Sequence, residues 1–265
     1  MAPPRKWQPP AVDCGGASGA ACAALTTAAL AQMAANVTGA IDGRDPEYLH
    51  QLRVGIRRLR TVLRVFKGKR LEKQLRKLTR PLGEARDWDV FVARFGKGKA
   101  RRRAAQLRCR ETLSSADFRA FFVATQNWAR EKAHTIGIPL VPAAAKALNR
   151  LHRKALKRAR HVEWQDEAGR HEVRIAIRRL RYACDFFSPC FDGARRYLHG
   201  LADLQDLLGD LNDIAVARRF GVRTAHAELK EREAALLRQL RPAWRAFEKR
   251  PRFWADKGTL PAAAR

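Results

Sequence analysis

The stretch HQLRVGIRRLRTVLRVF, residues 50–66, decides the fold because it combines helical spacing with a dense row of arginines. The stretch HEVRIAIRRLRYACDFF, residues 171–187, repeats it 121 residues later (171 minus 50), with eight of seventeen positions identical. Apolar residues in both stretches recur every three or four positions, which is the period of an α-helix. The chain is therefore predicted to contain two related helices.

A second pair of segments extends the repeat. LTRPLGEARDWDV, residues 78–90, aligns with LQDLLGDLNDIAV, residues 204–216. Each has Leu-Gly, then an acid, and then an aspartate four residues after the glycine. Glycine often follows the last turn of a helix, and aspartate often precedes the first. We therefore expect Gly83 and Gly209 to end one helix, and Asp87 and Asp213 to begin the next.

Most of the remaining chain also has a helical period. Alanine and leucine are frequent, prolines fall between the patterns, and no segment alternates like a strand. The predicted helices cover 17–41, 46–67, 70–82, 87–96, 99–113, 116–134, 143–162, 166–187, 194–208, 213–222, 224–241 and 242–249. The expected fold is all-α, with two pseudo-symmetric helical bundles from an internal duplication, packed around a basic central groove.

The domain boundaries follow from the same patterns. Residues 1–16 contain four prolines and no helical period, so a mobile N-terminal segment is expected. One domain is expected over 17–250, with a first half at 17–134, a linker at 135–142 and a second half at 143–250. Residues 251–265 are expected to form a C-terminal tail.

The charge of the chain points to an anionic partner. Of its 265 residues, 54 are Lys or Arg and 26 are Asp or Glu, which gives a formal net charge of +28. The acids can pair with at most 26 of the bases, so the folded chain repels itself unless a polyanion or counterions relieve it. Nucleic acid, an anionic lipid surface and another phosphate polymer are the candidate classes.

The arginines of each repeated helix share one stripe. On a helical wheel, His50, Arg53, Arg57, Arg60 and Arg64 fall within an arc of about 80°. Apolar residues flank the stripe on both sides, so we expect the helix to be packed on most sides with its arginines pointing into a groove. The second stripe consists of His171, Arg174, Arg178 and Arg181. Two other interpretations are a solvated basic face and internal salt bridges from some arginines, such as Arg58 and Arg179, to Asp87, Asp89, Asp210 and Asp213.

A third basic stripe lies on the predicted helix 143–162. It consists of Lys146, Arg150, Arg153, Lys157 and Arg160, with Lys154 and His161 at its edge. Taken alone, this pattern describes a plain amphipathic helix, and a solvated face explains it as well as a binding face does. The preceding helix of the first half, residues 17–41, has no Lys or Arg, so any shared groove would be asymmetric.

Arginine and histidine in one row suit phosphate. A guanidinium group binds phosphate oxygens in pairs and stays charged at any working pH. A histidine among arginines loses its proton readily, and a bound polyanion reverses that and makes it a donor. The stripe from His50 to Arg64 spans about 21 Å at about 1.5 Å per residue. This length fits a linear polyanion rather than a small metabolite.

The quoted segments HQLRVGIRRLR, HEVRIAIRRLRY, LGEARDWDV and LGDLNDIAV resemble the two halves of the CHAD domain, the conserved histidine α-helical domain. The resemblance covers nearly the whole chain, about residues 17–250. It implies two pseudo-symmetric helical bundles around a basic groove, binding of inorganic polyphosphate and association with polyphosphate granules. One departure is that the second half has Asn212 where the first has Arg86.

The polyphosphate-binding residues are assigned from the stripes and the resemblance together. No cofactor, metal or catalytic residue is expected, and the chain is expected not to be an enzyme. The predicted binding residues are His50, Arg53, Arg57, Arg60, Arg64, Lys146, Arg150, Arg153, Lys154, Lys157, His171, Arg174, Arg178 and Arg181.

The residues also bear on three rival functions. A metal site at the two histidines is disfavoured by the surrounding arginines and by the lack of carboxylates at ligand spacing. A histidine phosphatase is disfavoured because Glu172 follows Arg170-His171 where the motif needs glycine. Single-stranded RNA in the same groove stays as the alternative, although no aromatic residues alternate with the arginines.

The location of the protein is predicted from two further observations. Cys22, Cys109 and Cys184 lie inside helical patterns, which fits buried thiols in a reducing compartment. No run of eighteen strongly apolar residues occurs, so we expect no membrane-spanning helix. The basic helices lack the bulky apolar face and the tryptophan anchors of interfacial helices, so no membrane partner is expected. A cytoplasmic location at polyphosphate granules is expected, and the sequence says nothing about protein partners.

Overall fold

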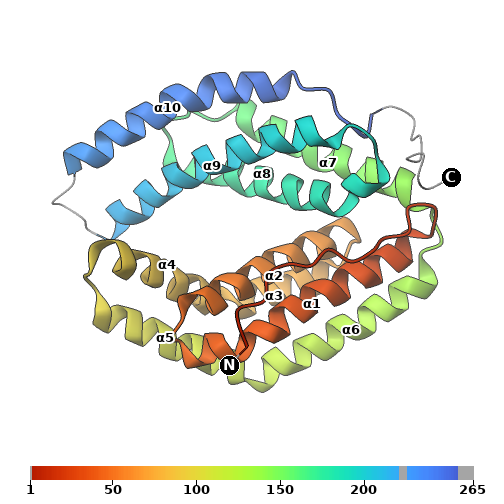
Figure 1. The fold of residues 1–265 in the computed structure, drawn as a ribbon, viewed down its shortest axis with the longest axis horizontal. Coiled ribbons are helices and arrows are strands. Elements are labelled where there is room, and N and C mark those ends of the chain that lie inside the picture. Colours follow the sequence, from red (N-terminus) through yellow and green to blue (C-terminus); the bar gives the residue numbers. More distant parts are fainter. Residues whose placement is uncertain (1, 221–225, 256–265) are drawn as a thin grey trace. The chain divides into compact units, whose positions relative to one another are not determined.

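The computed structural model describes residues 2–220 and 226–255, which form two compact units, Met1–Leu140 and Val141–Arg265 (Figure 1). Unit 1 contains the helices α1 (Ser18–Asp42), α2 (Pro46–Val65), α3 (Lys69–Leu78), α4 (Arg80–Phe95), α5 (Lys99–Ser114) and α6 (Ala116–Thr135). The helices of unit 2 are α7 (Leu140–Arg160), α8 (Glu167–Phe187), the short 3₁₀ helix η1 (Ser188–Cys190), α9 (Ala194–Arg219) and α10 (His226–Glu248). No strand occurs in the described ranges, and the all-α prediction is confirmed.

In unit 1 the helices pack around α1, which lies against α2, α5 and α6. Glycines allow the closest approach between α1 and α2. A β-carbon on Gly39 would lie 2.2 Å from the Tyr48 ring, and one on Gly55 would lie 2.9 Å from the Met33 side chain. Leu25, Met33, Leu52 and Leu59 are fully or almost fully buried at this contact layer.

The C-terminal end of α1 is held by polar side chains of α5. Arg102, Gln106 and Arg110 lie four residues apart on one face of α5. Their side chains donate hydrogen bonds to the carbonyl oxygens of Gly43 (3.4 Å), Ala40 (2.7 Å) and Ile41 (3.2 Å). The last carbonyls of a helix have no partner within it, so α5 supplies the missing donors.

Helix α1 is the one described helix that is long and apolar enough to cross a membrane by length and composition. No such helix was expected from the sequence, because it has no run of eighteen strongly apolar residues. Half of the apolar window is buried inside the structure. The central helix of a unit meets the same criterion, so this observation is weak support for a membrane span.

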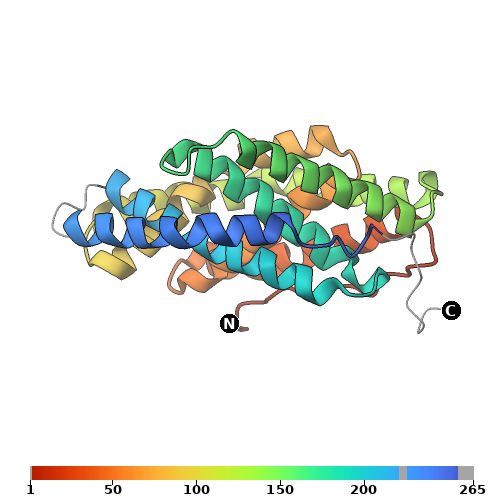
Figure 2. The same cartoon turned by 90° about the horizontal axis from the view of Figure 1, so that it is seen from above.

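In unit 2, α9 packs against both α8 and α10 (Figure 2). An aromatic cluster ties α7 to α9 and α10. The Nδ1 atom of the buried His152 ring of α7 lies 2.8 Å from the Tyr197 hydroxyl oxygen, and the same ring lies close to the Phe247 ring. Burial, followed by the charge of Arg252, lowers the pKa of His152 to about 4, so this histidine is a neutral core residue at pH 7.

Both terminal segments make specific contacts. In the segment 2–16, the Arg5 amide donates to Asn36 Oδ1 (3.1 Å) and Asn36 Nδ2 donates to the Arg5 carbonyl (2.9 Å). At the other end, Trp254 is buried and its Nε1 donates to Asn149 Oδ1 (3.0 Å). The predicted mobility of residues 1–16 concerns dynamics and stays a prediction. Most of the predicted tail, residues 256–265, lies outside the described residues.

Several predicted helix boundaries are wrong. Gly83 lies inside α4 and Gly209 inside α9, so neither ends a helix, and Asp87 and Asp213 are interior residues. One glycine costs a helix only about 0.5–1 kcal/mol, and the buried leucines around it outweigh that cost. Likewise α10 continues through Pro242. The predicted junction between 213–222 and 224–241 falls largely on residues 221–225, outside the described residues.

Candidate anion-binding site

Helices α2 and α8 begin in the same way, which gives their histidines the same register. The Asp45 side chain accepts a hydrogen bond from the Glu47 amide (2.8 Å). The Asp166 side chain accepts from the amides of Ala168 (3.1 Å) and Gly169 (2.8 Å). These are N-caps, and a histidine follows each after five residues, at 50 and at 171. The aspartate cap thus fixes the start of each helix, and with it the position of the histidine at the beginning of each stripe.

Both stripes lie on helices that are packed on most sides. Every residue from 47 to 66 on α2, and from 173 to 188 on α8 and η1, is buried or half-buried. The expectation of packing on most sides is therefore confirmed, and a fully solvated basic face is excluded for these two helices. The half-buried side chains of the two stripes are those of His50, Arg53, Arg57, Arg60, Arg64, Arg174, Arg178 and Arg181; His171 is exposed.

In unit 1, α4 adds a charge to the first stripe. Burial lowers the pKa of His50, the charge of Arg86 lowers it further, Glu47 raises it, and Arg57 and Arg53 lower it again. A readily deprotonated histidine was predicted from the sequence, but the predicted cause was the charge of the arginines in the same stripe as the histidine. Arg86 comes from α4, and we group it with His50, Arg53 and Arg57 as the unit 1 cluster.

Arg53 is the most confined guanidinium of the unit 1 cluster. Its Nη1 atom would lie 2.9 Å from a β-carbon on Gly83, so this glycine leaves the space that the side chain occupies. Its Nε atom is buried without a hydrogen-bond partner. Burial lowers the pKa of Arg53 to about 10, and the charges of Arg57 and Arg86 act in the same direction while Asp87 opposes them.

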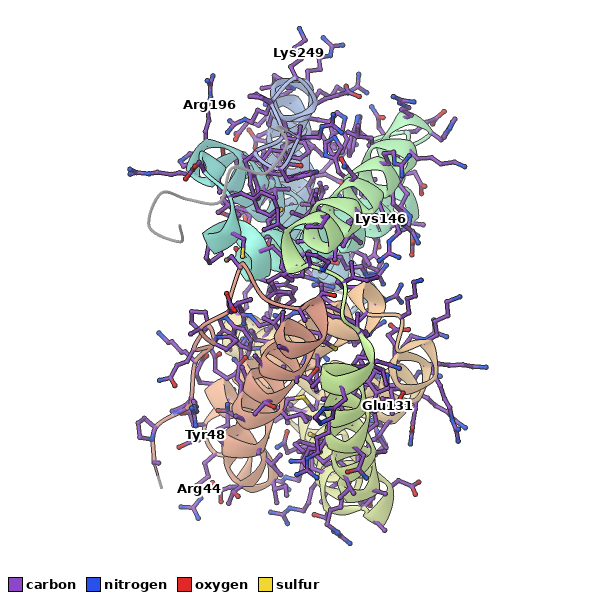
Figure 3. The ribbon with its side chains drawn as sticks, turned by 90° about the vertical axis from the view of Figure 1, so that its right-hand side faces the viewer. Arg44, Tyr48, Glu131, Lys146, Arg196 and Lys249 are labelled. Atoms are coloured by element: carbon purple, nitrogen blue, oxygen red, sulfur yellow. The ribbon has the colours of Figure 1, made fainter. Side chains whose placement is uncertain are left out.

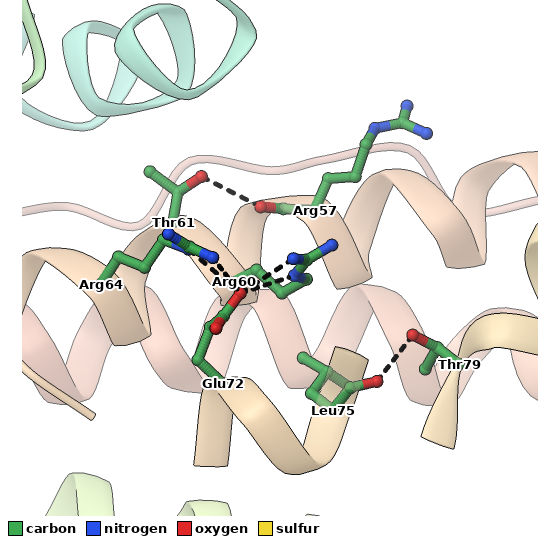
Figure 4. A network of polar contacts seen from close by, with 7 residues as sticks. All are labelled: Arg57, Arg60, Thr61, Arg64, Glu72, Leu75 and Thr79. Atoms are coloured by element: carbon green, nitrogen blue, oxygen red, sulfur yellow. Dashed lines mark hydrogen bonds and ion pairs between the residues drawn. The ribbon is translucent and has the colours of Figure 1, made fainter. Parts of the chain in front are cut away.

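Two arginines of the first stripe are already bound to a carboxylate (Figure 4). Glu72 of α3 accepts hydrogen bonds at Oε1 from Arg60 (2.9 and 3.0 Å) and from Arg64 (2.7 and 3.0 Å). Figure 4 shows the Arg57 guanidinium group pointing away from Glu72. Internal pairing thus occurs, but at Arg60 and Arg64 and to a glutamate, which the sequence analysis did not consider.

Two of the four aspartates named as salt-bridge partners, Asp89 and Asp210, have other contacts. Asp89 binds Arg102 of α5 (2.6 Å), and Asp210 binds Arg232 of α10 (3.4 Å). Arg58, proposed as a salt-bridge donor, places its guanidinium carbon 4.7 Å from the centre of the Trp7 ring. These aspartates hold helices of one unit together through residues outside the stripes.

In unit 2 an amide takes the place of the α4 charge. Asn212 of α9 aligns with Arg86, and its Oδ1 atom lies 3.2 Å from His171 Nδ1. The same oxygen accepts a hydrogen bond from Arg174 Nη1 (3.3 Å). Asn212 therefore connects the first two members of the second stripe through hydrogen bonds rather than through charge.

A buried ion pair lies beside the start of α8. Arg170, only 4% exposed, donates to the Trp164 carbonyl (2.6 Å) and to Glu233 Oε1 (2.7 Å). Arg218 donates to the other oxygen of Glu233 (2.5 Å). Each unit thus has one glutamate that holds two arginines. Sequence reasoning missed both glutamates, although Glu72 is the only acid between residues 67 and 80.

The predicted stripe of α7 is exposed throughout. Its opposite face is buried at Leu148, Ala155 and Ala159, so the predicted amphipathic pattern is confirmed. Figure 3 labels Lys146 on this helix, and the labelled side chains of Arg196 and Lys249 extend outward from the same unit. The exposed basic residues of α7 are Lys146, Arg150, Arg153, Lys154, Lys157 and Arg160.

The remaining chemistry of the described residues is limited. Cys22, Cys109 and Cys184 are free and buried, and burial raises the pKa of each thiol, to about 12 for Cys22 and Cys109. Within residues 2–220 and 226–255, no group of three or more His, Cys, Asp or Glu side chains could hold a metal ion.

Comparison with known proteins identifies the family. A family model described as the CHAD domain matches residues 24–221. The crystal structure of the CHAD domain from the plant Ricinus communis is similar to this chain, with 28% sequence identity and a TM-score of 0.80. That match covers 98% of this chain and 99% of the plant chain. No curated protein matches the sequence.

Proposed function

Because the chain belongs to the CHAD domain family, which is associated with polyphosphate-related proteins, we propose that it binds inorganic polyphosphate. The proposed ligand contacts are the stripes of α2 and α8. The exposed basic face of α7, the helix that precedes α8 in the chain, belongs to them as well. The proposal includes a shared groove for one polyphosphate chain. It also includes a role without catalysis and a cytoplasmic location at polyphosphate granules.

The unit 1 cluster is the observation that carries the proposal. His50, Arg53, Arg57 and Arg86 come from two helices, and burial together with the charges of the three arginines lowers the pKa of the histidine. The lowered pKa of Arg53 means that the folded protein disfavours this positive charge relative to water. A bound anion beside the cluster relieves the repulsion among its positive charges. A row of such groups on a helix matches an anion with many successive charges.

Binding would work through charge-assisted hydrogen bonds. Guanidinium groups donate in pairs to phosphate oxygens, and each neutralised phosphate releases condensed counterions. Affinity should therefore fall steeply as salt rises. His50 is neutral near pH 7 in the free protein because its pKa is lowered, and a polyanion beside it favours the protonated form. The histidine would then act as a further donor to the ligand.

The test compares polyphosphate with single-stranded RNA and duplex DNA in filter binding at one ionic strength. We expect polyphosphate to bind most tightly and to displace RNA, and RNA to displace polyphosphate poorly. Equal or tighter binding of RNA would instead support the single-stranded nucleic-acid alternative and overturn the proposed ligand. Salt must be matched in all arms because affinities of polyanions depend strongly on it.

A further inference from the structure

A second concentration of positive charge lies on the exposed side of α3. We call it the α3 face, and define it as Lys69, Arg70, Lys73, Arg76 and Lys77. All five side chains are exposed. At about 100° per residue they fall within an arc of about 120° around the helix axis. The row spans about 12 Å, from eight steps of about 1.5 Å.

The opposite side of α3 is firmly attached to unit 1. Leu71 and Leu75 are buried, and α3 packs against α2 and α6. Glu72, with a side chain only 12% exposed, is held by two arginines of α2. The preceding turn is tight, because a β-carbon on Gly68 would lie 2.9 Å from Leu63 and 3.0 Å from Trp128. The α3 face is therefore a rigid array rather than a loose tail.

The charges of the α3 face are not neutralised by nearby acids. The single acid of the helix, Glu72, points to α2. Among the residues that the structure describes, no ion pair includes any of the five cations. Like charges on adjacent turns repel one another, so this array favours a polyanion that lies along it.

We propose that the α3 face is a second contact site for polyphosphate, separate from the stripe of α2. This inference takes its ligand class from the proposed function. The cations form a row on a convex helix surface, which suits an extended polymer of phosphates rather than a small anion in a pocket. An anionic membrane fits less well, because the exposed large apolar residues of the described chain, Val90, Leu107, Val123 and Ile138, all lie outside α3.

The corresponding stretch of unit 2 has no such array. Residues 188–203 lie between its two repeated segments, as α3 does in unit 1. This stretch includes Asp192 and Asp203, and Asp203 lies 3.2 Å from His199. The α3 face is therefore a property of unit 1 alone, and unit 2 offers internal reference positions for an experiment.

Lysine footprinting of the whole protein tests the inference. Long-chain polyphosphate is added, exposed amines are acetylated, and the acetylation rate of each lysine is read by mass spectrometry. We expect Lys69, Lys73 and Lys77 to react several-fold more slowly with polyphosphate, and Lys230 and Lys249 of unit 2 to change little. Reaction of the α3 lysines at the reference rate would overturn the proposal. So would protection by RNA or phosphatidylserine vesicles but not by polyphosphate.

A triple variant measures the energetic contribution. K73Q/R76Q/K77Q should reduce the slope of log affinity against log salt by about 2, at roughly 0.7 per lost contact to a single-stranded polyanion. The matched control K230Q/R238Q/R245Q removes three exposed cations that are spread along α10 and should change the slope much less. Equal slopes for the two triple variants would contradict the α3 site.

The same footprint separates this inference from the proposed function. If R57E/R178E loses affinity and the α3 lysines stay unprotected in the wild type, the α3 site fails alone. If that variant binds like the wild type while the α3 lysines are protected, the stripe assignment fails alone. If neither effect occurs, both fail.

Discussion

The starts of the two stripes have nearly the same sequence but different chemistry. His50 lies half-buried, and burial together with the charge of Arg86 lowers its pKa. His171 is exposed and lies within hydrogen-bond distance of Asn212. Beside the difference in burial, part of the contrast arises outside the repeated helix, at one aligned position of the next segment. A neighbouring helix therefore determines whether a motif histidine experiences a cation or an amide.

We call Glu72 and Glu233 glutamate clamps, because each of them holds two arginines. The burial of the arginines differs between the two clamps. Glu233 binds Arg170, whose side chain is 5% exposed, whereas Glu72 binds arginines that are 26% and 30% exposed. The cost of an unpaired charge rises with its burial. Both units use one carboxylate for two arginines, and we expect folding to depend more strongly on the clamp of unit 2.

The largest expected effect on stability is that of Glu233→Gln. The substitution leaves the buried Arg170 charge without its carboxylate, and we expect the free energy of unfolding to fall by about 3 kcal/mol. Urea denaturation followed by circular dichroism measures this loss. Glu231→Gln, at an exposed position of the same helix, is the control. Equal stability of the two variants would show that the clamp of unit 2 does not hold the fold.

A smaller effect is expected for Glu72→Gln, and it should depend on pH. Burial raises the pKa of Glu72, but hydrogen bonds from Arg64 and Arg60 outweigh burial and leave the pKa below its ordinary value. Because the pKa of Glu72 is lower in the folded protein, its ionised form stabilises the fold at pH values above the pKa of the unfolded chain, about 4.3. This stabilisation is lost as the pH falls through the pKa of the folded protein. We expect a cost of about 2 kcal/mol at neutral pH that shrinks in acid.

Urea denaturation of Glu72→Gln at neutral pH and in acid checks both parts of this prediction. Glu84→Gln is a matched control, because Glu84 pairs with Arg108 at a similar distance of 2.6 Å but both side chains are about half exposed. Solvent screens that pair, so no measurable change is expected. A pH-independent cost for Glu72→Gln would contradict the assignment of Glu72 as an ionised clamp.

The smallest effect sharpens the comparison of the histidines directly. Arg86→Asn gives unit 1 the residue of unit 2, and removing the cation should raise the pKa of His50. Burial remains, so the pKa should stay below the ordinary value. A nuclear magnetic resonance titration of the His50 ring protons measures the change. Arg94→Asn, two turns further along α4 and exposed, should leave the titration as it is in the wild type.

The sequence predicted the helical class, most helix bounds and the half-buried character of both stripes. These features follow from local period and from apolar residues on both sides of the arginines at α2 and α8. The wrong boundaries at Gly83 and Gly209 had a local cause as well, because glycine favours a helix end but does not require one. The leucines around both positions were the signal that a longer helix fits.

The contacts of the arginines were the part that the sequence could not reveal. Arg60 and Arg64 look equivalent to Arg57 on a helical wheel, yet they reach Glu72, which lies twelve and eight residues further along the chain. Arg86 belongs to a different helix from His50, so only the fold brings it close. Side-chain pairing depends on tertiary packing, whereas a wheel describes one helix at a time.

The central claim is that the stripes of α2 and α8 bind polyphosphate, and affinity measurement on R57E/R178E tests it most directly. K230E/R238E carries the same charge change on the exposed side of α10 and serves as the control. R57Q/R178Q is measured beside them in case charge reversal perturbs folding, which circular dichroism would reveal. At matched salt we expect R57E/R178E to lose binding and R57Q/R178Q to weaken it while the control keeps most of it. Affinities of the two stripe variants equal to that of the control would contradict the claim.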